Sequence, residues 1–288
     1  MHSKIPKGKL LIIGGHEDKG AIAGENLIVH KKKDAPTHFE ILGRLISRIP
    51  REHHIIEIIA SASSIPLEME QIYIDSYKRE GFTHVGIIKV ENAEDANDDD
   101  SVKRIKGSHA VFFTGGDQSK LVSCIAGSKL LSAITNKYHA DQHFIVGGTS
   151  AGAMAMPEII IVGGRIHEAL FKGDIKLASG FDLIQNVIVD THFIKRGRFG
   201  RLAHAVILNP TCLGIGLGEN TALLISEGNH CECIGSGMVI LIDGAAMQGT
   251  NIDGVDETTP IVVENLAITI LAEGSVYLLN DRKVLHQN

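Results

Sequence analysis

Short apolar runs alternate with amphipathic helical stretches through the first half of the 288-residue chain, and this alternation restricts the possible folds more than any other feature. The runs have the length of buried strands and lie at residues 9–13, 55–60, 84–90, 110–113 and 144–146. Apolar side chains three and four residues apart mark helices at residues 35–49, 69–77 and 121–134, with a break expected at Gly127. Because crossover helices join parallel strands, the pattern predicts a three-layer α/β fold with a mostly parallel sheet.

The rhythm changes in the second half of the chain. Only residues 199–208 are firmly helical, and strand-like runs follow one another at residues 159–162, 183–189, 214–217, 222–225, 238–243, 267–271 and 275–280. Strands that are joined by short connections pair in the antiparallel direction. We therefore expect antiparallel strands and hairpins to extend the parallel sheet, within a single domain over residues 1–288.

The bulk composition excludes several classes of protein. With 44% hydrophobic residues the chain has the composition of a soluble globular protein, and its net charge of −6 argues against a surface for nucleic acid or anionic membranes. No apolar run approaches the roughly 18 residues that a membrane helix needs, and the first nine residues lack a signal-peptide core. We expect a cytoplasmic protein with no nucleic-acid partner and no membrane partner.

The sequence predicts no metal site and no cofactor. Four cysteines, at positions 124, 212, 231 and 233, are too few and too irregular for a disulfide framework or a zinc site, and we expect reduced thiols. The acidic stretch 91–101 lacks the central glycine and terminal glutamate of a calcium loop. A solvated loop or a helix cap is the expected structure there.

Residues 144–156 have the pattern of a strand, a sharp corner and a helix. The apolar run ends in Gly148-Thr149-Ser150-Ala151-Gly152, and the small residues around Ser150 are those that a nucleophile elbow needs, because larger side chains would clash where the strand and helix cross. Ser150 would stand at the carboxyl edge of the sheet. The Ala151 N–H beside it would form half of an oxyanion hole.

A nucleophilic serine needs a histidine to take its proton and an acid to orient that histidine. Five histidines follow Ser150, and His192 stands out because it ends a strand-like run and is followed by Arg196, Arg198 and Arg201. Guanidinium groups suit carboxylates, so this positive patch predicts a substrate that carries carboxylates. Taken alone, His192 fits a structural role slightly better than that of a base.

Two glycine-rich segments offer the remaining parts of a site. Glu219 lies between two apolar runs, where a carboxylate needs a partner such as an imidazole unless it sits in a solvated turn. In the corner at residues 114–118, the Gly116 N–H could complete the oxyanion hole and Gln118 could reach the substrate. Alternatively, that corner only caps the helix that follows it.

Taken together and in this order, five motifs resemble the S51 peptidase family, which includes the cyanophycinases and the aspartyl dipeptidases. They lie at residues 12–19, 113–118, 147–153, 190–201 and 216–222, and span most of the chain. The resemblance implies a class I glutamine-amidotransferase-like α/β fold and a Ser150-His192-Glu219 triad. It also implies serine exopeptidase action on cyanophycin, a polyaspartate that carries arginine on its β-carboxyl groups, with β-Asp-Arg dipeptides as products.

The resemblance further implies a substrate pocket and a homodimer. The pocket residues that carry over are Gln118, Asp190, Arg196, Arg198 and Arg201, and Thr191 is expected to bind substrate with them. Cyanophycinases usually have glutamine between the aspartate and the histidine of this motif, whereas this chain has Thr191, and Gly218 replaces the usual acidic residue before Glu219. Thr191 leaves open a related exopeptidase that acts on other acidic or isoaspartyl peptides. A binding protein without catalytic activity on the same fold is the third hypothesis.

Overall fold

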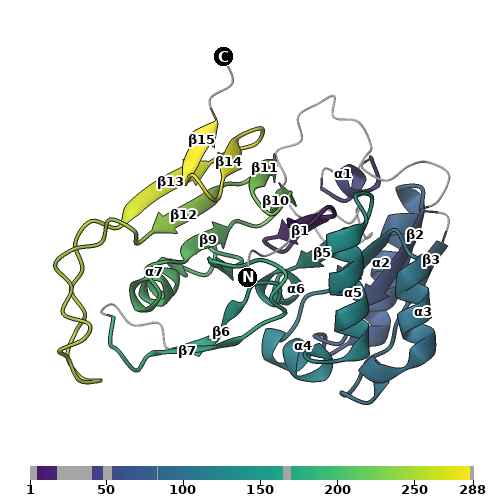
Figure 1. Cartoon of the computed structure of the whole chain (residues 1–288), viewed down its shortest axis with the longest axis horizontal. Coiled ribbons are helices and arrows are strands. Elements are labelled where there is room, and N and C mark those ends of the chain that lie inside the picture. The colour runs from purple at the N-terminus through teal and green to yellow at the C-terminus, as the bar shows by residue number, and fades with distance from the viewer. Residues whose placement is uncertain (1–4, 18–40, 48–53, 83, 165–169, 286–288) are drawn as a thin grey trace.

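The computed structural model describes residues 5–17, 41–47, 54–82, 84–164 and 170–285. Its largest sheet has nine strands in the order β15-β14-β11-β10-β1-β5-β4-β2-β3 (Figure 1). The five strands from β1 to β3 in this order are parallel to one another. They are β1 (Lys9–Ile13), β2 (Ile55–Ile59), β3 (His84–Ile87), β4 (Ala110–Phe113) and β5 (Ile145–Thr149). All five strands and their parallel arrangement confirm the prediction.

Helices cover both faces of this parallel half. They are α1 (Leu42–Ser47), α2 (Pro66–Arg79), α3 (Asp99–Gly107), α4 (Gln118–Ile125), α5 (Lys129–Ala140) and the short α6 (Ala151–Met154). Alternate side chains of β1 point to opposite faces, so Leu10 belongs to the core with α4 and α5, while Leu11 belongs to the core with α1 and α2. The three-layer prediction is therefore confirmed.

Three points concern the helices expected from the sequence. The helix predicted at residues 121–134 is two helices, separated as expected at Gly127, whose φ is +73°. Helix α3 and the short 3-10 helix η1 (Asp95–Asn97) were not predicted, but Asp98 caps α3 by accepting a hydrogen bond from the Ser101 N–H at 2.8 Å. Most of the helix predicted at residues 35–49 lies outside the described residues.

Antiparallel strands extend the sheet beyond β1. Strand β10 (Thr221–Ser226) pairs with β1, and β11 (His230–Gly235), β14 (Val276–Leu278) and β15 (Lys283–Leu285) follow. The predicted antiparallel extension is confirmed by β10 and β14, whereas β11 and β15 were not predicted.

The other late strands do not join this sheet, and for them the expected extension is wrong. Strands β8 (Val187–Asp190), β9 (Leu213–Leu217), β12 (Val239–Asp243) and β13 (Ala267–Leu271) form a second sheet, and β6 (Ile159–Gly164) pairs with β7 (Ile175–Ser179) as a hairpin. Helix α7 (Phe199–Leu208), which has the predicted bounds, packs on β8 and β9. Apolar periodicity identifies a strand but not its neighbour, so the sheet to which each strand belongs depends on long-range packing.

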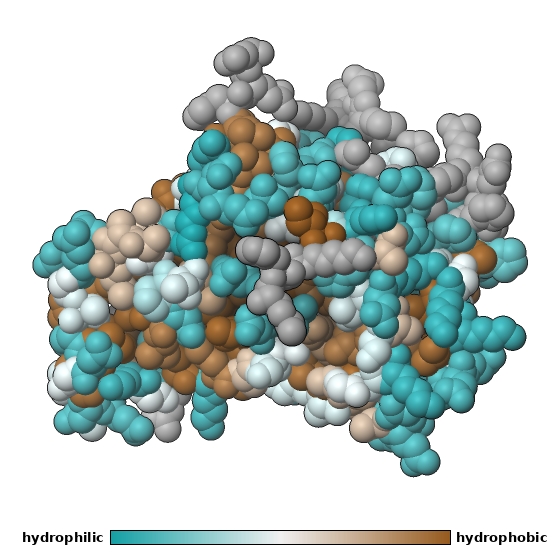
Figure 2. Space-filling model, in the orientation of Figure 1, coloured by the Kyte–Doolittle hydropathy of each residue, from teal (hydrophilic) through white to brown (hydrophobic). Residues whose placement is uncertain are grey.

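One hydrophobic cluster includes buried residues of both sheets, among them Val146, Val189 and Leu241. The single domain over residues 1–288 stays a prediction. On the face in Figure 2, hydrophilic residues dominate the side that carries α3, and hydrophobic residues are more frequent around α7. The four cysteines are free and buried, as expected. None of the described helices has the length and apolar character needed to cross a membrane.

Candidate active site

The corner between β5 and α6 has the geometry of a nucleophile elbow. Ser150 has φ +51° and ψ −113°, a backbone conformation that residues other than glycine rarely adopt and that costs about 1–3 kcal/mol. A Cβ atom at Gly152 would lie 2.2 Å from the Phe113 carbonyl oxygen, and one at Gly148 would lie 2.7 Å from the Gly152 backbone. The strand and the helix therefore meet so closely that only glycine fits at these two positions. At the corner between them, Ser150 is partly exposed at the strand end.

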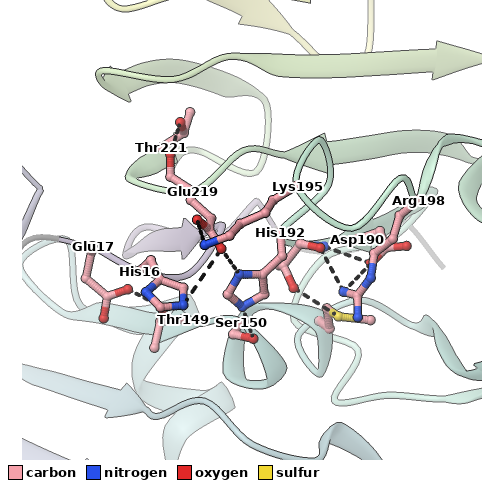
Figure 3. Close-up of polar contacts among 12 residues, drawn as sticks. His16, Glu17, Thr149, Ser150, Asp190, His192, Lys195, Arg198, Glu219 and Thr221 are labelled. Atoms are coloured by element: carbon pink, nitrogen blue, oxygen red, sulfur yellow. Dashed lines mark hydrogen bonds and ion pairs between the residues drawn. The ribbon is translucent and has the colours of Figure 1, made fainter. Parts of the chain in front are cut away.

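Three side chains from distant parts of the chain form a hydrogen-bonded series at this edge (Figure 3). Ser150 Oγ lies 3.0 Å from His192 Nε2, and His192 Nδ1 lies 2.8 Å from Glu219 Oε1. His192 follows β8 and Glu219 follows β9, so the carboxyl ends of two neighbouring parallel strands bring these side chains to the end of β5. In the productive tautomer, Nδ1–H donates to the carboxylate and Nε2 accepts from the serine hydroxyl.

The loop after β1 holds the histidine and glutamate segments in place. The His192 N–H donates to the Gly14 carbonyl at 2.8 Å, and the Asn220 N–H donates to the Gly15 carbonyl at 2.9 Å. Gly15 has φ +96°, and a Cβ atom there would lie 2.4 Å from His192 Cε1 and 2.5 Å from Nε2. Gly15 thus forms one wall of the imidazole site. The sequence marked Gly15 only as the end of a strand and did not reveal this role.

The electrostatic surroundings keep the imidazole neutral and the carboxylate ionised. Burial lowers the pKa of His192; the hydrogen bond to Glu219 opposes this shift, and the charge of Arg196 adds to it. Burial by itself would raise the pKa of Glu219, but hydrogen bonds from His192 and Lys195 hold that pKa below its ordinary value. A neutral imidazole beside an ionised carboxylate is the state that can accept a proton from a serine.

The glycine corner after β4 lies beside the serine. A Cβ atom at Gly115 would be 3.4 Å from the Ser150 Cβ, and Gly116 has φ +142°. Within the described part of the chain, the N–H groups of Gly116 and Ala151 donate no backbone hydrogen bond outside helices and strands. Both are therefore available to an oxyanion, and their role as an oxyanion hole stays a prediction.

Asp190, Arg198 and Arg201 form a mutual ion-pair network. The Asp190 side chain is fully buried, and its Oδ1 accepts from Arg198 Nη1 at 3.1 Å and from Arg201 Nη2 at 2.5 Å. Its Oδ2 accepts from Arg201 Nε at 2.8 Å. The two guanidinium groups are only 14% and 12% exposed. These three predicted pocket residues bind one another in this structure, and the network has a net charge of +1.

The other predicted pocket residues differ in exposure. Arg196 is exposed beside the histidine. Gln118 is partly buried at the start of α4, and its Nε2 donates to the Ile161 carbonyl at 2.7 Å, which fixes the direction of the amide. Thr191 is fully buried, and its hydroxyl contacts Met154 Sδ at 3.3 Å. Thr191 therefore has no exposed side-chain surface with which to touch a substrate in this conformation.

Three residues near the triad were not predicted individually. Lys195 Nζ lies 3.2 Å from Glu219 Oε2, and His16 Nε2 lies 3.8 Å from Glu219 Oε1. Next to His16, the buried Glu17 accepts hydrogen bonds from Tyr73 Oη at 2.5 Å and from the hydroxyl of residue 149 at 2.6 Å. For His16 and Glu17, the available signal was their position after the strand-ending pair of glycines at residues 14 and 15, because ligands bind at the carboxyl ends of parallel strands.

A serine at a strand–helix corner, hydrogen-bonded to a histidine that is paired with a carboxylate, is the arrangement of the serine-type hydrolases. The model of Peptidase family S51 matches residues 31–232. The chain belongs to this family and is a serine-type peptidase.

Curated relatives cover nearly the whole chain. Cyanophycinase of Synechococcus elongatus is 31% identical over 281 residues, which are 98% of this chain and 82% of the relative. Cyanophycinase of Geminocystis herdmanii is 33% identical, covering 94% of this chain and 93% of the relative, and that of Nostoc sp. is 32% identical, covering 97% and 88%.

Among solved structures, the crystal structure of a peptidase from an acI-B1 Actinobacterium has a TM-score of 0.65 at 21% identity. The match covers 96% of this chain and 98% of that one. At this identity the similarity shows the fold, and it agrees with the α/β architecture described above.

Proposed function

We propose that the protein is a serine exopeptidase that hydrolyses cyanophycin and releases β-Asp-Arg dipeptides, with Ser150, His192 and Glu219 as its triad. The observation that carries this proposal is the Ser150–His192–Glu219 hydrogen-bond series, with separations of 3.0 and 2.8 Å, in a chain similar to cyanophycinases over nearly its full length.

The mechanism follows from the positions of these groups. Ser150 Oγ attacks the scissile carbonyl carbon while its proton moves to His192 Nε2, and Glu219 stabilises the imidazolium that forms. The N–H groups of Ala151 and Gly116 donate to the oxyanion, each contributing about 3 kcal/mol to the transition state. His192 then protonates the leaving amine, and a water molecule, deprotonated by the same nitrogen, releases the acyl group from Ser150.

The exposed positive charge at the site suits a substrate that carries free carboxylates. Lys195 and Arg196 are both exposed next to the triad. We assign the recognition of free carboxylates, which in cyanophycin belong to the attached arginine residues and to the chain end, mainly to Arg196, because Arg198 and Arg201 already share the carboxylate of Asp190. The one excess positive charge of that network adds to the attraction. Gln118 keeps an amide oxygen for a substrate N–H, since its nitrogen is bound to a carbonyl.

Thr191 motivates a second candidate within the same class of enzyme. Its buried side chain presents no amide to a ligand, unlike the glutamine usual in cyanophycinases. A pocket without that amide favours a related exopeptidase that cleaves other acidic or isoaspartyl peptides. The homodimer, the cytoplasmic location and the absence of nucleic-acid partners and cofactors stay predictions.

The test is incubation of the purified protein with insoluble cyanophycin and measurement of β-Asp-Arg release. We expect release by the native protein and a loss of at least about 10³-fold in Ser150→Ala. Labelling by a fluorophosphonate shows independently whether the serine is active. A fluorophosphonate-reactive preparation that releases no dipeptide would refute the cyanophycin assignment, and faster cleavage of short isoaspartyl peptides would favour the second candidate. Unchanged hydrolysis by Ser150→Ala would refute the triad.

A further inference from the structure

His16 adds a third metal-binding type of side chain to the histidine–glutamate pair of the triad. One ligand atom each from His16, His192 and Glu219 lies within 4.8 Å of the others. His16 Nε2 is 3.8 Å from Glu219 Oε1, and the two imidazole rings meet edge to face with centroids 5.4 Å apart (Figure 3). The mechanism above assigns no step to His16.

We propose that His16, His192 and Glu219 form a reversible, inhibitory binding site for Zn²⁺. Two imidazoles and one carboxylate are a donor set that Zn²⁺ accepts readily, with water as the fourth ligand. At zinc–ligand distances of about 2.0–2.2 Å, tetrahedral neighbours lie about 3.4 Å apart. The most distant pair of ligand atoms therefore has to approach by about 1.4 Å at most, whereas His192 Nδ1 and Glu219 Oε1, 2.8 Å apart, have to separate by about 0.6 Å if both bind the metal. The His16 side chain is 64% exposed and is free to make this movement.

The backbone already holds the three ligand-bearing segments together. The loop that carries His16 accepts hydrogen bonds from the His192 N–H, through Gly14, and from the Asn220 N–H, through Gly15. The Gly14 N–H donates to the Thr221 carbonyl at 2.8 Å on the other side of Glu219. Zinc binding thus needs side-chain adjustment and no rearrangement of loops, which reduces its cost in conformational entropy.

Zinc at this place would remove the base of the triad. If the metal takes His192 Nδ1, the ring proton that Nδ1 donates to Glu219 has to reside on Nε2, which can then no longer accept the proton of Ser150. If the metal takes Nε2, it occupies that lone pair directly. Lys195 Nζ, 3.2 Å from Glu219 Oε2, competes for the carboxylate and weakens zinc binding.

This inference rests on the proposed function only for its inhibitory effect, so binding is measured first and without turnover. In Ser150→Ala, Zn²⁺ is titrated against a chromophoric chelator, and Co²⁺ is added as a spectroscopic probe of tetrahedral coordination. We expect one equivalent to bind, at least tenfold weaker binding when His16→Gln is added, and severalfold tighter binding when Lys195→Gln is added. His143→Gln is the matched control, because His143 is exposed at the opposite end of β5.

Inhibition is then measured with the native serine in place. Zn²⁺ is expected to stop hydrolysis of the polymer, and EDTA is expected to restore it. The Zn²⁺ concentration that halves the rate, relative to each variant's own metal-free rate, should rise at least tenfold in His16→Gln. If Zn²⁺ does not bind, or binds equally tightly with and without His16, the proposed zinc site is wrong. If zinc binds as expected but no β-Asp-Arg is released in its absence, the metal site stands and the proposed function fails.

Discussion

Gly15→Ala tests whether the wall behind His192 fixes the position of the base. The new Cβ would lie 2.4 Å from the ring, whereas real Cβ contacts start at about 3.0 Å and become ordinary at 3.4 Å. The imidazole therefore has to move by about 0.6–1.0 Å. A displacement of about 1 Å in a reacting group costs on the order of 10²-fold in rate, or about 2.7 kcal/mol of transition-state stabilisation. We expect kcat/KM to fall by at least that factor.

The matched control is Gly127→Ala, between α4 and α5. Gly127 has φ +73°, comparable to the +96° of Gly15, but a Cβ there would meet nothing within 4 Å. Both variants should lose about 1–3 kcal/mol of unfolding free energy to backbone strain, measured by urea unfolding, and only Gly15→Ala should lose activity. Fluorophosphonate labelling of Ser150 gives a second measure that is independent of the substrate. A folded Gly15→Ala protein that is labelled at the native rate would refute the steric argument.

Four further predictions address the charges around the site. Glu219→Gln should lower kcat/KM by about 10³–10⁴-fold without loss of folding, because an amide cannot stabilise the imidazolium; a reduction below tenfold would contradict this role. With EDTA present, the labelling rate should rise with pH through a midpoint below 6.5, the ordinary pKa of histidine, because only neutral His192 accepts a proton. Arg196→Gln removes a charge that lowers this pKa, so its midpoint should lie at higher pH, and an unchanged or lower midpoint would be inconsistent with that cause. Asp190→Asn should cost about 3–5 kcal/mol of unfolding free energy, measured in urea, because it leaves two largely buried guanidinium groups without a counter-charge. The control Lys129→Gln, at an exposed ion pair, should cost about 1 kcal/mol or less. Equal losses in the two variants would argue against burial as the cause.

The sequence by itself determined the parts of the protein that depend on local physical chemistry. Apolar periodicity located the five parallel strands and α7, and the glycines around Ser150 indicated a corner in which larger side chains do not fit. The resemblance of the five motifs to the S51 family then implied His192 and Glu219 as partners; in the structure His192 lies 3.0 Å from Ser150, and Glu219 lies 2.8 Å from His192. The strands, α7 and the corner could be predicted because backbone sterics and side-chain period act over a few residues, whereas the triad partners are far apart in the chain and were inferred from the resemblance.

Tertiary structure alone decided which polar groups satisfy one another. The arginines of residues 196–201 form one positive patch in the sequence, yet the fold turns Arg198 and Arg201 onto the buried Asp190 and leaves Arg196 exposed. It also assigned β8 and β9 to a second sheet and brought His16 beside Glu219, 203 positions later in the chain. A period of two or 3.6 residues specifies which side chains face inward, but the partner of a buried charge depends on the packing of segments far apart in the chain.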